Sequence, residues 1–244
     1  MSIPTITKDD LVLRIHLNEQ LQNFDQMVEY ATMLATKYTL NQDERYMVWA
    51  SYKNSIGKRR VSWKALQNHL PKATDPDEAQ TIIAYMKKIE KEMDALIDKV
   101  INLLDTTLIP TSTNDEYKCF YMKMKSDNLR YKSEYLSGEE SVKNNVIAEE
   151  SYKSTYQHAV AHLSKSDPTR LSIGLNAAMF YYQILKNPDK AKEIAYETIN
   201  NGIEELDLGL LNAEEATYRK SVLKVIKEMI INCSTPDVVK PPSQ

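Results

Sequence analysis

The sequence predicts an all-α fold, and three observations support this prediction. The 244 residues include only 5 glycines, too few for many β-hairpin turns or for glycine loops that hold phosphates. Apolar residues recur at a spacing near 3.6. Several segments also open with a polar residue that is followed three positions later by a glutamate, a pattern typical of helix starts. With 42% apolar residues, the chain is long enough to bury a sizeable core.

The expected helices follow from their capping residues. Capping boxes are predicted at Asn41 with Glu44, Thr113 with Glu116, and Asn212 with Glu215. Asp75, Asp167 and Asn187 each precede a proline that suits the first helical turn. These signals predict about nine helices, at residues 7–21, 24–38, 42–68, 76–107, 114–135, 142–164, 168–186, 188–203 and 213–232. Short connections predict antiparallel neighbours in a layered array.

Composition excludes several functional classes. A formal net charge of −3 and a pI near 5.9 argue against a general nucleic-acid binder. The sequence shows neither a signal-peptide core nor a run of 18 apolar residues, so we expect a soluble intracellular protein that does not enter a membrane. Cys119 and Cys233 lack zinc-type spacing and are expected to be reduced packing residues. The proline-containing tail, residues 234–244, is expected to be flexible.

The sequence carries no recognisable enzyme motif. Gly-x-Ser-x-Gly, His-Glu-x-x-His and Cys-x-x-Cys are all absent, so we expect no catalytic residues and no cofactor. His158 and His162 lie four residues apart and could present two metal ligands on one helix. The residues between them supply no general base. A histidine pair without a metal is therefore the preferred interpretation.

Three predicted helices repeat polar residues at a spacing of seven, which places both members on one face. The pairs are Lys53 with Arg60, Lys123 with Arg130, and Asn176 with Gln183, the last accompanied by Met179. Asp127 lies between Lys123 and Arg130, close enough along the helix to pair with both. Each stripe alone is typical of a solvated helix face. Their joint occurrence favours a shared site.

Facing one another across a groove, these stripes would suit a phosphate monoester. Such a group carries about −1.5 to −2 charge at pH 7, and arginine binds it through charge-assisted hydrogen bonds. Asp127 would hold the neighbouring cations in place. Tyr131 could donate its hydroxyl to a phosphate oxygen, and Asn176 could pair with a peptide backbone on both sides.

Three segments resemble 14-3-3 proteins. Arg45–Trp63 contains Tyr-Lys-Asn-x-x-Gly-x-Arg-Arg-x-Ser-Trp, Cys119–Tyr131 contains Phe-Tyr-x-Lys-Met-Lys-x-Asp-x-x-Arg-Tyr, and Pro168–Pro188 contains Pro-x-Arg-Leu-x-x-x-Leu-Asn-x-x-x-Phe-Tyr-Tyr-x-Ile-Leu. The similarity runs from about Leu11 to about Asn232.

This resemblance implies one cup-shaped domain over residues 1–233 with an amphipathic groove. Such proteins are mostly cytoplasmic, usually homodimeric and not catalytic; they clamp, mask or relocate partners that carry phosphoserine or phosphothreonine. On matched positions, the phosphate would be held by Lys53, Arg60, Arg130 and Tyr131. Asn176 would bind the ligand backbone, and Lys123 would bind a ligand carbonyl or carboxylate. Leu175 and Met179 would form part of the apolar wall of the groove.

Two positions in the expected groove depart from the family pattern. Gln183 stands where a glutamate is usual, which predicts a more positive groove, and Met229 replaces an asparagine that grips the ligand backbone. Losing one such hydrogen bond would weaken binding about two- to tenfold. Cys233 stands nearest to a missing tryptophan. The alternatives are a divergent scaffold with a weakened or self-occupied groove and a phosphate-independent helical adaptor.

The expected dimer surface also departs from the pattern. Leu17, Leu21 and Tyr85 could supply apolar contact, but Asn23 and Gln26 replace the arginine and aspartate that usually pair with Lys88 and Glu92. Exposed ion pairs contribute only about 0–1 kcal/mol each, so apolar burial could maintain the dimer. A looser dimer or a monomer is the alternative.

Two serines are candidate phosphorylation sites. Ser62 follows Arg59 and Arg60, a pattern that basophilic kinases accept, and a phosphate there would weaken dimerisation by repulsion. Ser243 lies one residue from the end of the sequence, so a phosphorylated tail could bind the groove and inhibit it. An ordinary helix residue and a flexible tail are the simpler interpretations.

Overall fold

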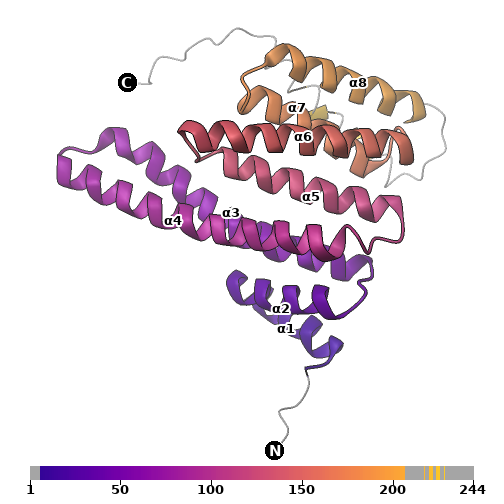
Figure 1. Cartoon of the computed structure of the whole chain (residues 1–244), viewed down its shortest axis with the longest axis horizontal. Coiled ribbons are helices and arrows are strands. Elements are labelled where there is room, and N and C mark those ends of the chain that lie inside the picture. Colours follow the sequence, from indigo (N-terminus) through magenta and orange to yellow (C-terminus); the bar gives the residue numbers. More distant parts are fainter. Residues whose placement is uncertain (1–5, 207–216, 218–219, 222–223, 226–227, 229–244) are drawn as a thin grey trace, which may run out of the picture. The chain divides into compact units, whose positions relative to one another are not determined.

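The computed structural model of the chain describes residues 6–206, 217, 220–221, 224–225 and 228. This part forms eight α-helices and no strand (Figure 1), which confirms the all-α prediction. The helices are α1 (Lys8–Gln20), α2 (Phe24–Lys37), α3 (Gln42–His69), α4 (Pro76–Leu103), α5 (Asp115–Ser133), α6 (Gly138–His162), α7 (Pro168–Gln183) and α8 (Pro188–Leu206). A 3-10 turn, Leu70–Lys72, follows α3, and a π-helical turn, Leu104–Leu108, follows α4. Among the described helices, none is both long and apolar enough to span a bilayer.

Most predicted helix starts are confirmed because capping is local chemistry. The Asn41 side chain accepts from the Glu44 backbone N–H, and the Glu44 side chain returns the bond to Asn41. Asp75, Asp167 and Asn187 each cap the helix that follows them.

The predicted starts of α5 and α6 were wrong, and the ninth predicted helix begins outside the described residues. The cap of α5 is Asn114 rather than Thr113, and its amide oxygen accepts from the Tyr117 N–H at 2.8 Å. Helix α6 begins at Gly138, directly after Ser137 in the N-cap position, rather than at residue 142. Gly138 has a positive φ of 61°, which glycine adopts without steric cost. The ninth predicted helix, residues 213–232 with the Asn212 and Glu215 box, falls largely outside the described part.

The chain divides into two compact units, residues 1–111 and 112–244. In the first unit, α1 packs on α2 and α3, α2 on α3, and α3 on α4. Its core includes the fully buried side chains of Leu11, Ile15, Leu34, Tyr52 and Ile97. In the second unit, α5 packs on α6 and α7, α6 on α7, and α7 on α8.

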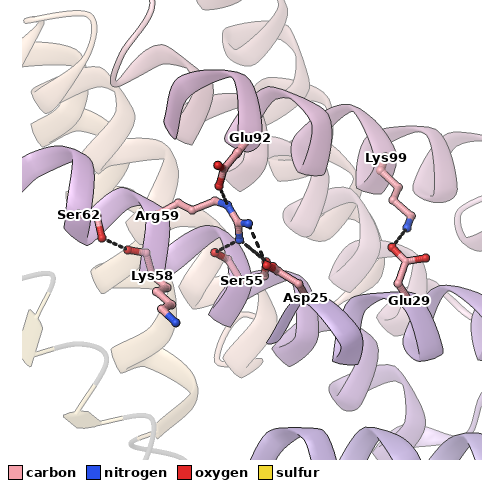
Figure 2. A network of polar contacts seen from close by, with 8 residues as sticks. All are labelled: Asp25, Glu29, Ser55, Lys58, Arg59, Ser62, Glu92 and Lys99. Carbon is pink, nitrogen blue, oxygen red and sulfur yellow. Dashed lines mark hydrogen bonds and ion pairs between the residues drawn. The ribbon is translucent and has the colours of Figure 1, made fainter. Parts of the chain in front are cut away.

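Arg59 ties three helices of the first unit together (Figure 2). Its guanidinium forms a bidentate contact with Asp25 of α2, at 2.7 and 3.0 Å, and its Nε donates to Glu92 of α4 at 2.9 Å. Ser55 lies within this network, because its hydroxyl donates to the same Asp25 carboxylate at 2.6 Å. A separate ion pair joins Glu29 of α2 to Lys99 of α4 at 2.6 Å.

The close packing of α7 on α8 depends on a glycine. A β-carbon at Gly174 would come within 3.0 Å of side-chain atoms of Thr198 on α8, so this position has no room for a larger residue. Beside it, Leu171 and Ala178 pack against Ala191 and Ala195. This core holds α7, which carries several predicted site residues.

The Arg59 network predicts a pH-dependent contribution to stability. The hydrogen bond from Arg59 lowers the pKa of Asp25 to about 2, against the opposing effect of burial. A depressed pKa gives stability that is present above pH 3.8 and lost as the pH falls toward 2. Since the Asp25 side chain is 62% exposed, the contribution should not exceed about 1 kcal/mol.

This contribution is measured by urea unfolding between pH 5 and about 2. Asp25→Asn should reduce the loss of stability over this range, and in an Arg59→Gln background the same substitution should have little effect. A wild-type pH profile that Asp25→Asn leaves unchanged would contradict the assignment.

Candidate functional site

Asp127 is the centre of a buried polar network in the second unit. Its residue is only 6% exposed, yet three helices reach its carboxylate. Lys123, one turn earlier on α5, donates to Oδ2 at 2.8 Å. Asn176 of α7 donates from Nδ2 to both carboxylate oxygens, at 2.8 and 3.0 Å. The predicted proximity of the α5 and α7 stripes is therefore observed.

Tyr152 of α6 is a member of this network that the sequence analysis missed. Its hydroxyl donates to Asp127 Oδ1 at 2.7 Å and accepts from Arg130 Nε at 3.1 Å. The expected pairing of Asp127 with both cations is thus direct for Lys123, whereas Arg130 is linked through Tyr152. No local signal identifies Tyr152, because its partners lie 22 and 25 residues earlier in the chain.

The charges in the network stabilise one another. Burial alone would raise the pKa of Asp127, but Lys123, Arg130 and the hydrogen bond from Tyr152 outweigh burial and lower it. Burial by itself would lower the pKa of Arg130, but Tyr152 and Asp127 raise it. Burial raises the pKa of the Tyr152 hydroxyl, and Asp127 raises it further. The Asp127 carboxylate therefore stays ionised, and the Arg130 guanidinium stays charged.

The solvated-face interpretation is wrong for α5. The side chains of Lys123, Asp127 and Arg130 are only 18%, 9% and 12% exposed. Arg130 also lies 3.6 Å from Glu134 and stacks 4.8 Å from the centre of the Tyr131 ring. These contacts hold the guanidinium in one orientation.

The α7 residues divide into two kinds of environment. Leu175 and Met179 are partly buried and pack against the apolar core between α7 and α8. Gln183, the last residue of α7, is exposed. Asn176 is half-buried like Leu175 and Met179, but its amide hydrogens are directed at Asp127.

Lys53 and Arg60 belong to α3 in the first unit. Lys53 is exposed, and its ammonium lies 4.3 Å above the Trp49 ring. Arg60 is half-buried beside Arg59. Their convergence with Arg130 stays a prediction.

Comparison with known proteins identifies the family. The family model described as 14-3-3 protein matches residues 14–234, nearly the whole chain. This chain belongs to the 14-3-3 family. The membership confirms the resemblance inferred from the three segments above.

Several named 14-3-3 relatives cover most of this chain. A 14-3-3-like protein from Fucus vesiculosus is 35% identical over 222 residues, which is 91% of this chain and 87% of the relative. The 14-3-3-like protein GF14 phi of Arabidopsis thaliana is 36% identical over 88% of this chain and 82% of its own. The 14-3-3 protein zeta of Bombyx mori is 34% identical over 90% of this chain and 88% of its own.

The predicted dimer residues of this 14-3-3 chain lie on α1, at its C-cap residue Leu21 and on α4. Leu17, Leu21 and Tyr85 are 48%, 75% and 59% exposed, so their apolar side chains lie at the surface of the first unit. Lys88 is exposed as well. Glu92, however, is already paired with Arg59 of the same chain at 2.9 Å.

The candidate phosphorylation sites differ in what the structure describes. Ser62 is exposed on α3 and donates to the Lys58 carbonyl at 3.1 Å, an ordinary helix contact. It borders a pocket of about 270 Å³ that Asp25 and Arg59 also line. Met229, Cys233 and Ser243 lie outside the described residues.

The network predicts that substituting the buried acid Asp127 destabilises the protein far more than substituting an exposed acid of the second unit. Asp127→Asn leaves Lys123 and Arg130 without their buried counter-charge and should destabilise the protein by about 3–5 kcal/mol. Tyr152→Phe removes two hydrogen bonds to charged groups and should cost about 1.5–3 kcal/mol. Glu116→Gln, an exposed change on α5, is the control. Urea unfolding measures all three, and equal effects at Asp127 and Glu116 would contradict the network.

Proposed function

We propose that this 14-3-3 protein is an adaptor that binds phosphoserine- and phosphothreonine-containing segments of partner proteins. The observation that supports this most directly is the buried Asp127 network. Its carboxylate binds Lys123 and Asn176 directly and is linked to Arg130 through Tyr152. Pre-organised cations bind a phosphate without losing rotamer freedom at that moment.

The phosphate is assigned to Arg130 and Tyr131 of α5 together with Lys53 and Arg60 of α3. Arginine suits this role because its planar fork binds phosphate oxygens in a bidentate manner. Tyr152 occupies Arg130 Nε, which leaves the terminal guanidinium nitrogens for the ligand and for Glu134. Lys123 is assigned to a ligand carbonyl or carboxylate.

Asn176 has a more specific role than the sequence suggested. A carboxylate only accepts hydrogen bonds, so Asp127 requires the NH₂ side of the Asn176 amide to face it. The Asn176 oxygen is then directed away and accepts from a ligand backbone N–H. Leu175, Met179 and Gln183 are assigned to the neighbouring groove wall.

The remaining assignments follow from family membership. Residues 1–233 act as one binding domain, and the family match across both compact units supports this. The protein works by binding rather than by catalysis, in the cytoplasm, and as a homodimer through Leu17, Leu21 and Tyr85. Phosphorylated Ser62 would oppose dimerisation, and phosphorylated Ser243 would occupy the groove.

Phosphate-dependent binding is measured by fluorescence anisotropy with a phosphoserine peptide and its unphosphorylated twin. Only the phosphorylated peptide should bind, because the assigned groups recognise a dianion. Arg60→Ala and Arg130→Ala should each weaken binding about 10- to 100-fold, the range of charge-assisted hydrogen bonds. Lys91→Ala, an exposed lysine of α4, is the matched control. Equal binding of the two peptides would overturn the proposal.

The dimer is tested by sedimentation velocity. Leu21→Glu and Tyr85→Glu place a charge in the apolar surface and should shift the protein toward the monomer. Val146→Glu alters a similarly exposed side chain of α6, 62% accessible, and should leave the dimer intact. A wild-type monomer, or equal dissociation in all three variants, would contradict the assigned surface.

A further inference from the structure

Asp115, His158 and His162 form a cluster on the face where α5 meets α6. His158 Nε2 lies 3.1 Å from Asp115 Oδ1, and His162 Nδ1 lies 3.2 Å from Asp115 Oδ2. One ligand atom from each residue falls within 4.8 Å of the other two. The two imidazole rings are 4.3 Å apart between centroids. These residues take no part in the Asp127 network.

The spacing is close to that of a metal site. Bonds of about 2.0–2.1 Å to a tetrahedral zinc place neighbouring ligand atoms about 3.3 Å apart. Each imidazole nitrogen is already near this distance from one Asp115 oxygen, at 3.1 Å from Oδ1 for His158 and 3.2 Å from Oδ2 for His162. Small side-chain rotations would bring all three atoms around one ion.

His158 carries a second observation that points to a ligand. Its Nε2 is shielded from solvent and makes no hydrogen bond of acceptable geometry, although Asp115 is 3.1 Å away. A cation between the nitrogen and the carboxylate would satisfy both atoms.

We propose that Asp115, His158 and His162 bind one divalent transition-metal ion, with Zn²⁺ the preferred species. Two imidazoles and one carboxylate are a zinc ligand set, whereas Ca²⁺ and Mg²⁺ prefer oxygen ligands alone. The side chains of Asp115 and His162 are 48% and 43% exposed, so water can complete the coordination. Lys118 acts against the bound cation and keeps its affinity moderate.

The proposed ion would link two helices that also carry the Asp127 network. Asp115 is the first residue of α5, and His162 is the last residue of α6. Binding would therefore fasten the start of one helix to the end of the other. Such binding stabilises the folded protein in proportion to the ion concentration over its Kd.

The sequence could show only part of this site. The sequence shows the spacing of the two histidines, and a pair without a metal is the interpretation it favours because the residues between them supply no general base. Asp115 precedes His158 by 43 residues, and only the packing of α5 on α6 brings it to the cluster.

The test uses the full chain, stripped of metal by chelator and exchanged into chelator-free buffer. Calorimetry with Zn²⁺ should show one equivalent bound with a micromolar Kd, and thermal unfolding should shift upward. Co²⁺ should produce visible d–d bands without a strong thiolate charge-transfer band, because the proposed ligands are nitrogen and oxygen. None of these readouts depends on phosphopeptide binding.

Matched variants test whether Zn²⁺ binds at these three residues. His162→Gln and Asp115→Asn should each weaken Zn²⁺ binding at least tenfold. His16→Gln with His69→Gln removes the other two of the chain's 4 histidines and should leave binding unchanged. Undetectable binding at 1 mM Zn²⁺, unchanged binding in His162→Gln, or a thiolate band with Co²⁺ would overturn the proposal and leave the cluster as a histidine–aspartate ion pair.

Discussion

The buried carboxylate of Asp127 is the constraint on which the second unit's polar site depends. An ionised group that is 6% exposed must be compensated locally, because transfer of an unpaired charge from water is strongly unfavourable. Lys123, Tyr152 and Asn176 supply that compensation from three helices. The same contacts that satisfy Asp127 therefore orient the groups assigned to the ligand.

The first unit shows how neighbouring residues of one helix acquire different roles. Adjacent positions differ by about 100° around a helix, so Arg59 and Arg60 point in different directions. Arg59 joins Asp25 and Glu92 and is structural. Arg60 is the residue assigned to the phosphate. A sequence pattern that contains both arginines cannot assign these roles without the packing of α2 and α4 on α3.

Local chemistry explains which features could be predicted from sequence. The predicted caps at Asn41 and Asp75 are confirmed because each side chain accepts from a backbone N–H only three residues later. The Lys123–Asp127 pair was correct for the same reason, as residues four apart meet on a helix. Tyr152 and Asp115 were missed because their partners are 22 or more residues away and meet only after the helices pack. The burial of the α5 stripe likewise depends on α6 and α7.

Asp127 is assigned to position the ligand-binding groups rather than merely to contribute a negative charge. The most direct test compares phosphoserine-peptide affinity of the wild type, Asp127→Asn and Glu116→Gln at a temperature where circular dichroism shows all three folded. Loss of a negative charge beside two cations would by itself strengthen phosphate binding. If Asp127 positions these groups, Asp127→Asn instead binds at least tenfold more weakly and Glu116→Gln binds as the wild type does. Equal or tighter binding by folded Asp127→Asn would contradict it.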